Sequence, residues 1–81
     1  MASTLSTDAL IHTIRQEIDE IDLSSLTANT EFRQIEGWNS LYSLVLMAMT
    51  STEYDVELTG QQVQGIRTVQ DLCNTINTQR N

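Results

Sequence analysis

The sequence predicts an all-α fold, a small four-helix bundle in which the third helix is very short and a long loop joins the first two helices. Apolar residues recur every three or four positions near both ends of the chain, which is the period of one helix face. The chain contains no proline, so nothing forbids long helices. Its 81 residues predict one domain, residues 1–81, with a core at about 7–77 and frayed ends.

The first helix is predicted from an apolar stripe with helical spacing. The stripe consists of Leu10, Ile11, Ile14, Ile18 and Ile21. Ser6 or Thr7 is expected to cap the start of this helix with its side-chain oxygen. Acidic residues crowd the far end, where the helix dipole disfavours negative charge, and we interpret them as a solvated face.

A long loop follows at residues 22–39, where no helical period is present. We expect this loop to be ordered, because it carries apolar side chains that can hold it on the core. They are Leu23, Leu26, Phe32 and Ile35. The second helix is predicted to begin at Asn39 or Ser40 and to run to about Thr52, with Asn39 as its cap.

The last third of the chain predicts a short link and two helices. Residues 54–58 alternate apolar and acidic side chains, as in an extended link. Residues 59–62 have the pattern of a capping box that opens a brief helical turn, which Gly65 ends. Thr68 is expected to cap the last helix, and residues 77–81 to fray. The apolar face of that helix is Val69, Leu72, Cys73 and Ile76.

The charge balance excludes several kinds of partner. The chain has 11 acidic residues and 4 basic residues, all of them arginine, for a net charge of -7. Such a domain is repelled by nucleic acid and by anionic lipid, whereas a protein with a basic patch suits it. The start lacks the features of a signal peptide, and the longest apolar run, residues 44–49, is too short to span a bilayer. We expect a cytoplasmic monomer without membrane insertion.

The sequence does not indicate an enzyme. Cys73 is the only cysteine and His12 the only histidine, which excludes an internal disulfide and disfavours a structural zinc site. No nucleophile–base pair or pair of catalytic carboxylates is evident. We therefore assign no catalytic residue and no metal ligand.

The segment Glu36-Gly37-Trp38-Asn39-Ser40-Leu41 is the strongest candidate for a functional site. Glycine gives the backbone freedom, tryptophan can anchor the loop, and the cap places a serine hydroxyl at an exposed helix N-terminus. Such a terminus tolerates an attached phosphate. Since no base stands beside Ser40, it is better suited to be modified by another enzyme than to act as a nucleophile by itself. The alternative interpretation is a plain helix cap.

From Thr7 to Ile76 the chain resembles the acyl carrier proteins, small domains that bear phosphopantetheine. The segment GWNSL is similar to their G-x-D-S-L motif. Leu26 and Phe32 stand where the family has apolar residues that anchor the first loop. The last helix resembles the family in its pattern Thr68-Val69-x-x-Leu72.

The resemblance implies that Ser40 receives 4'-phosphopantetheine from coenzyme A through a phosphopantetheinyl transferase, with Trp38, Asn39 and Leu41 around the attachment point. It further implies that the arm holds acyl groups as thioesters. Acyl-loading and chain-modifying enzymes, with basic or apolar docking patches, would be the other partners. The pathway would be fatty-acid-like, polyketide or otherwise specialised.

Two departures from the family pattern carry a prediction. Asn39 stands where the family usually has aspartate, and Tyr42 and Val45 stand where acidic docking residues are common. We expect docking through Tyr42, Val45 and Glu36, with apolar and hydroxyl contacts, in a carrier from a dedicated pathway. If the bundle shelters an acyl chain, the expected lining is Leu46, Met49, Leu72 and Ile76. An aminoacyl or peptidyl carrier, or an acidic interaction module without the arm, remains an alternative.

Overall fold

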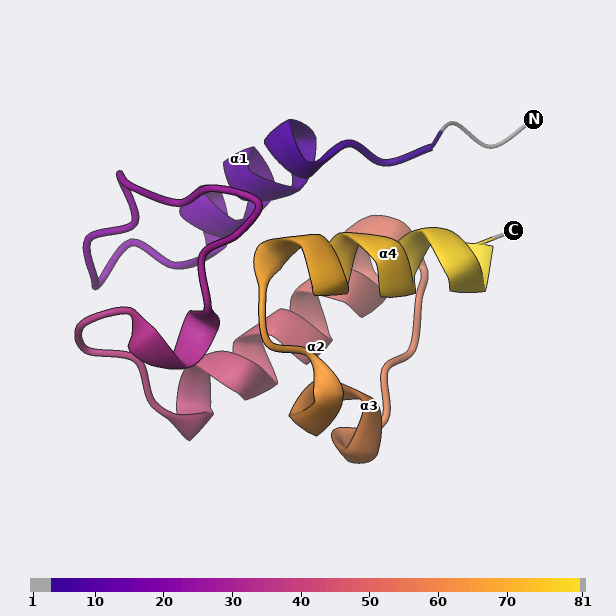
Figure 1. The fold of residues 1–81 in the computed structure, drawn as a ribbon. Helices are drawn as coiled ribbons and strands as arrows, with labels where there is room; N and C mark the ends of the chain where they lie inside the picture. The colour runs from indigo at the N-terminus through magenta and orange to yellow at the C-terminus, as the bar shows by residue number, and fades with distance from the viewer. Residues whose placement is uncertain (1–3, 81) are drawn as a thin grey trace.

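The computed structural model describes residues 4–80, in which four α-helices and one 3-10 turn follow each other (Figure 1). The elements are α1 (Thr7–Glu17), the 3-10 turn η1 (Phe32–Gln34), α2 (Ser40–Tyr54), α3 (Gly60–Gly65) and α4 (Val69–Arg80). These residues contain no β-strand. The predicted all-α fold, with a six-residue third helix and a long first loop, is confirmed.

Helix α1 begins where the sequence predicts and ends earlier. The Ser6 side chain accepts a hydrogen bond from the Ala9 N–H at 3.1 Å and caps the helix. The apolar stripe suggested a helix reaching Ile21, which is wrong, because the helix ends at Glu17 and Ile18 is already extended. Ile18 is nevertheless buried. Most of the acidic run therefore lies in the loop and not at the negative end of the helix dipole.

The loop between α1 and α2 is held to the segment at the start of α4 by backbone contacts. The Phe32 N–H donates to the Arg67 carbonyl at 2.9 Å. Glu31 and Thr68 form an isolated antiparallel β-bridge, and the Phe32 side chain is buried. The prediction of an ordered loop is confirmed, and Figure 1 shows it reaching toward the start of α4.

Helix α2 is longer than predicted at its C-terminal end. The helix includes Tyr54, which the sequence assigned to an extended link, and the Tyr54 hydroxyl donates to the Thr13 hydroxyl of α1 at 2.9 Å. Asp55 then adopts a left-handed conformation with φ 56° and ends the helix. Residues 55–59 form the link between α2 and α3, and Val56 and Leu58 are its buried residues.

Side chains cap both remaining helices, as predicted. At α3, the Thr59 hydroxyl accepts from the Gln62 N–H while the Gln62 side chain accepts from the Thr59 N–H, and the helix ends at Gly65. At α4, the Thr68 hydroxyl accepts from the Asp71 N–H and the Asp71 carboxylate accepts from the Thr68 N–H. Each pair satisfies backbone donors that a helix start otherwise leaves without partners.

The end of α4 is attached to the start of the chain. The side chain of Asn77 accepts from the Leu5 N–H at 2.8 Å and donates to the Leu5 carbonyl at 3.0 Å. We expected residues 77–81 to fray, whereas the helix continues to Arg80. Residue 81 lies outside the described residues.

The core lies between α1, α2 and α4, with α1 packed against both other helices. All four residues of the predicted α4 face are buried. The other buried apolar residues are Leu10, Ile11, Ile14, Ile18, Leu23, Leu26, Phe32, Leu46, Met49, Val56, Leu58 and Ile66. Helix α3 contributes no buried residue and lies at one side of this core (Figure 1), so it can form the wall of a groove.

Candidate functional site

The turn before α2 requires a glycine. Gly37 has φ +86°, a conformation that side-chain-bearing residues rarely adopt. A Cβ atom on Gly37 would lie 3.0 Å from the Cγ2 atom of Ile21, which is too close for an ordinary contact. The turn therefore packs against the loop that follows α1, and this contact sets the direction in which the chain enters α2.

Trp38 anchors the start of α2, as the sequence predicts. Its ring stacks on that of Phe32, with centroids 5.2 Å apart, and contacts the Tyr42 ring at 5.4 Å. Aromatic pairs at these separations add about 0.5–1.5 kcal/mol beyond the burial of their area. The three rings connect η1 to the first turn of α2 and hold the residues between them in place.

Asn39 and Ser40 form the N-terminus of α2. The Asn39 side chain accepts from the Leu41 N–H at 2.8 Å, so asparagine caps the helix as aspartate would. Ser40 is the first helical residue and is exposed, and its hydroxyl makes no hydrogen bond within residues 4–80. The first turn of α2 contains no acidic residue, so the partial positive charge of the helix end is not neutralised by a carboxylate on that turn.

A groove of about 500 Å³ opens beside Ser40, between η1, α2 and α3. Its walls include Ser40, Ser43 and Met47 of α2 and Val63 of α3. Apolar atoms form most of the lining, and Leu58 is one of the buried residues at its base. A serine on the rim of an apolar groove can hold an attached group and shelter an apolar extension of it.

Two of the four residues expected to line an acyl pocket lie in this groove. Leu46 and Leu72 line it, whereas Met49 and Ile76 are buried in the core and do not. Met47 takes the place expected for Met49. The groove thus lies on the α3 side of α2, away from α1.

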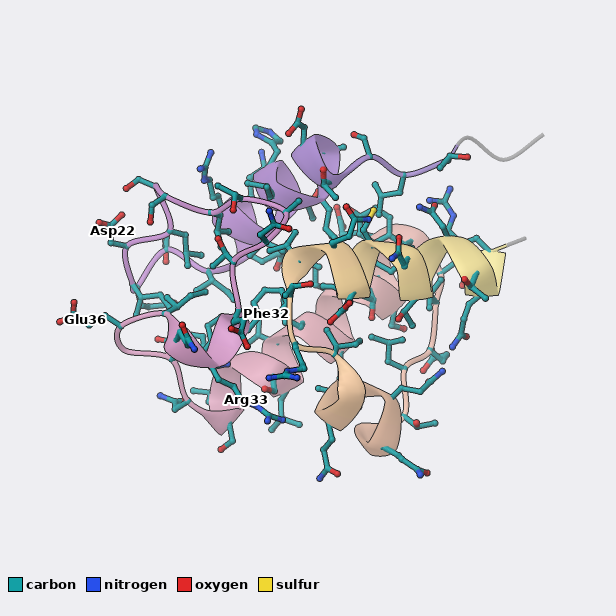
Figure 2. All side chains as sticks on the ribbon, in the orientation of Figure 1. Asp22, Phe32, Arg33 and Glu36 are labelled. Carbon is teal, nitrogen blue, oxygen red and sulfur yellow. The ribbon has the colours of Figure 1, made fainter. Side chains whose placement is uncertain are left out.

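The exposed apolar surface of α2 differs from the docking residues named from the sequence. Tyr42 and Val45 are half-buried and pack against the core, so most of their surface is already used. Leu41 and Leu44 are instead 60% and 61% exposed. Glu36 projects from the loop into solvent (Figure 2). Leu44 was not named from the sequence as a docking residue, and it lies three positions from Leu41 and therefore on the same side of the helix.

The remaining candidate groups lie away from this site. Cys73 is buried in the core, its thiol donates to the Leu5 carbonyl at 3.2 Å, and burial raises its pKa. His12 is exposed on α1, where its ring contacts Gln16. Residues 4–80 contain no group of three His, Cys, Asp or Glu residues that could hold a metal ion. No helix in that range is long and apolar enough to cross a membrane.

Comparison with known protein families matches the chain to one of them. The model of the family described as phosphopantetheine attachment site matches residues 9–76, most of the chain. The chain therefore belongs to this family of carrier domains, and the resemblance noted in the sequence is confirmed. Its cofactor is 4'-phosphopantetheine, held covalently on a serine, as the resemblance implied. A search of curated proteins found no match.

The geometry around Ser40 suits this cofactor. An exposed hydroxyl leaves space for a phosphodiester outside the helix, and the partial positive charge of the helix N-terminus favours an anion there. When bound, the cofactor supplies a thiol on a long flexible arm that can hold acyl groups. The chain's own contribution is to fix the position of Ser40 through Gly37, the aromatic stack and the Asn39 cap, with an apolar groove beside it.

Proposed function

We propose that Ser40 is the serine that carries the 4'-phosphopantetheine arm. The observation that supports this most directly is the exposed Ser40 hydroxyl, without a hydrogen bond in residues 4–80, at the rim of the apolar groove. A transferred phosphopantetheinyl group would form an ester bond with the Ser40 oxygen. The diphosphate bond of coenzyme A would break, adenosine 3',5'-bisphosphate would leave, and the hydroxyl proton would pass to a base on the transferase.

Other described serines suit this role less well. Ser6 caps α1 with its hydroxyl, and Ser51 donates to Glu57 at 2.8 Å. Ser24 donates to Asp22 at 2.7 Å, and this contact lowers the pKa of that carboxyl. Attachment at any of the three would break an existing contact.

Two further serines lack such hydrogen bonds in the described part of the chain and differ from Ser40 in position. Ser43 is half-buried, one turn into α2. Ser25 lies in the long loop beside a hollow that is also lined by Asp22, Glu31 and Glu36. Carboxylates there would repel a phosphodiester. Ser40 combines exposure, a helix N-terminus and a groove.

The domain at residues 9–76 is of a carrier family rather than a catalytic one. We propose that it holds acyl intermediates as thioesters and shuttles them between enzymes of a specialised biosynthetic pathway in the cytoplasm. The shape of the site supports an acyl cargo, because most of the groove lining is apolar. A net charge of -7 suits short encounters with partners that carry basic patches.

Carrier domains interact with a phosphopantetheinyl transferase and with biosynthetic enzymes. We propose that these partners contact the exposed face formed by Leu41 and Leu44 beside the attachment point. This face carries no charge, so recognition there depends on burying apolar area. We propose that the carrier works as a monomer, since the same face has to serve successive partners.

The attachment site can be tested by mass spectrometry. We expect the purified chain to gain the mass of one phosphopantetheinyl group when incubated with coenzyme A and a broad-specificity transferase. Ser40→Ala should abolish the gain, and Ser43→Ala, a matched change one turn later, should leave it intact. A folded wild-type chain that gains no mass, or a gain that persists in Ser40→Ala, would contradict the proposal.

A further inference from the structure

The groove beside Ser40 differs in charge from the rest of the molecule. The chain has 11 acidic and 4 basic residues, yet the described residues that line the groove include one arginine, Arg33, and no carboxylate. Figure 2 shows Arg33 between the first part of α2 and α3, while Glu36 points away from it into solvent. The groove lining thus carries one positive side chain and no negative one, on a molecule whose net charge is negative.

The other three arginines have partners outside the groove. Arg15 donates to two carbonyls of the long loop at 3.0 and 2.9 Å. The guanidinium of Arg67 lies 3.6 Å from the carboxylate of Glu31, and Arg80 lies over a tyrosine ring at 5.9 Å. Among the four arginines, Arg33 is the one that lines the groove, and its hydrogen bond in the described residues goes to a single backbone carbonyl.

Arg33 retains donors that could bind a ligand. It is exposed, and one of its terminal N–H groups donates to the Gln64 carbonyl of α3 at 3.2 Å. A guanidinium has five N–H donors in a planar fork, so this contact leaves the Nε–H and others for an anion. The contact with Gln64 also directs the side chain across the groove from η1 to α3.

We propose that Arg33 is a positioning residue that pairs with the phosphodiester joining the arm to Ser40, and that it thereby holds the arm along the groove. This inference rests on the proposed attachment at Ser40. Arg33 and Ser40 line the same groove, and an arginine–phosphate pair is charge-assisted and can be bidentate. The pair would connect η1, α2 and α3 around the arm, because Arg33 keeps its contact with Gln64.

The experiment compares the apo and holo forms of the wild-type chain by NMR. Complete conversion to the holo form is first verified by mass. We expect the Nε–Hε signal of Arg33 to shift on conversion and the Nε–Hε signal of Arg67 to stay in place. The shift should diminish as salt is raised, because salt screens an exposed ion pair. In addition, the phosphorus signal of the holo form should move in Arg33→Gln and remain unchanged in Arg67→Gln.

The possible results separate this inference from the proposed function. A chain that gains no mass contradicts attachment at Ser40 itself. Complete conversion with an unmoved Arg33 signal overturns only the role of Arg33. A third arm compares chains loaded from malonyl-coenzyme A and from acetyl-coenzyme A. If the Arg33 signal moves only in the malonyl form, its partner is a cargo carboxylate and the pairing with the phosphodiester is wrong.

Discussion

At the scale of single residues, Gly37 and Trp38 determine where Ser40 lies. Gly37 provides a backbone conformation that other residues rarely adopt, at a point where a Cβ atom would lie only 3.0 Å from the Ile21 side chain. Trp38 then places one ring between two others, one from η1 and one from α2. The position of Ser40 thus depends on contacts made by residues that precede α2 in the chain.

Replacing Gly37 should be costly. We expect Gly37→Ala to lower the free energy of unfolding by about 1–3 kcal/mol, because alanine would combine a strained φ with a 3.0 Å approach to Ile21. Chemical denaturation measures this change. Gly65→Ala is the matched control, since a Cβ there meets nothing within 4 Å and the residue is helical. Equal stability of the two variants would show that the turn is not constrained.

At the scale of helices, local signals predicted the starts far better than the ends. Ser6, Asn39, Thr59 and Thr68 all cap the helices that the sequence assigned to them. A cap acts within three residues, so a local pattern reveals it. The ends depend on distant contacts instead, such as the bond between Tyr54 and α1, 41 residues away.

The groove lining was only half predicted for a related reason. Residues 40–52 are uncharged, so no polar face indicates which side of α2 points inward. Each position along a helix turns the side chain by about 100°. Met47 and Met49 are two positions apart and therefore point to nearly opposite sides, so that Met47 lines the groove while Met49 lies in the core. By contrast, the attachment candidate was predictable, because its cap and its motif are both local.

Helix α3 depends on its capping box. We expect Thr59→Ala to weaken α3 by about 1 kcal/mol, because the Gln62 N–H loses its acceptor. The amide protons of residues 60–65 should then exchange about fivefold faster with solvent, as measured by hydrogen exchange. Thr52→Ala removes an exposed threonine from α2 and serves as the control. Unchanged exchange in α3 would show that packing, and not the cap, holds this helix.

The exposed face of α2 can be tested in a transferase assay. We expect Leu44→Asp to raise the KM for modification about tenfold, the effect of losing one strong contact at an interface. The same change at Thr52, exposed farther along α2, should have little effect. If the two variants behave alike, added charge and not lost apolar contact explains the result, and the proposed docking face is wrong.

At the scale of the whole molecule, three helices form the core and the fourth leaves a groove at one side. The two ends of the described chain are held together by Asn77 and Leu5. Cys73 is buried next to this contact, and its thiol donates a hydrogen bond to the same Leu5 carbonyl. Burial of this thiol links the stability of the molecule to pH.

The burial of Cys73 should destabilise the fold in alkaline solution. Its pKa is raised in the folded chain, so the unfolded chain loses the thiol proton first. The free energy of unfolding should therefore be unaffected by this group at neutral pH and should fall above the ordinary thiol pKa, by up to about 1.4 kcal/mol per pH unit. Urea unfolding between pH 7 and pH 10 measures the slope. Cys73→Ala should fall less steeply, and parallel slopes would exclude the effect.

Because Cys73 is the only sulfhydryl of the polypeptide and the fold covers it, an arm on Ser40 would present the one reactive sulfur at the surface. The thiol of the arm would thus be kept from forming a disulfide with Cys73 of the same molecule, a bond that would block loading of the arm. A maleimide dye applied to the native protein would also label only the molecules that carry an unloaded arm, and so report the fraction ready to accept cargo.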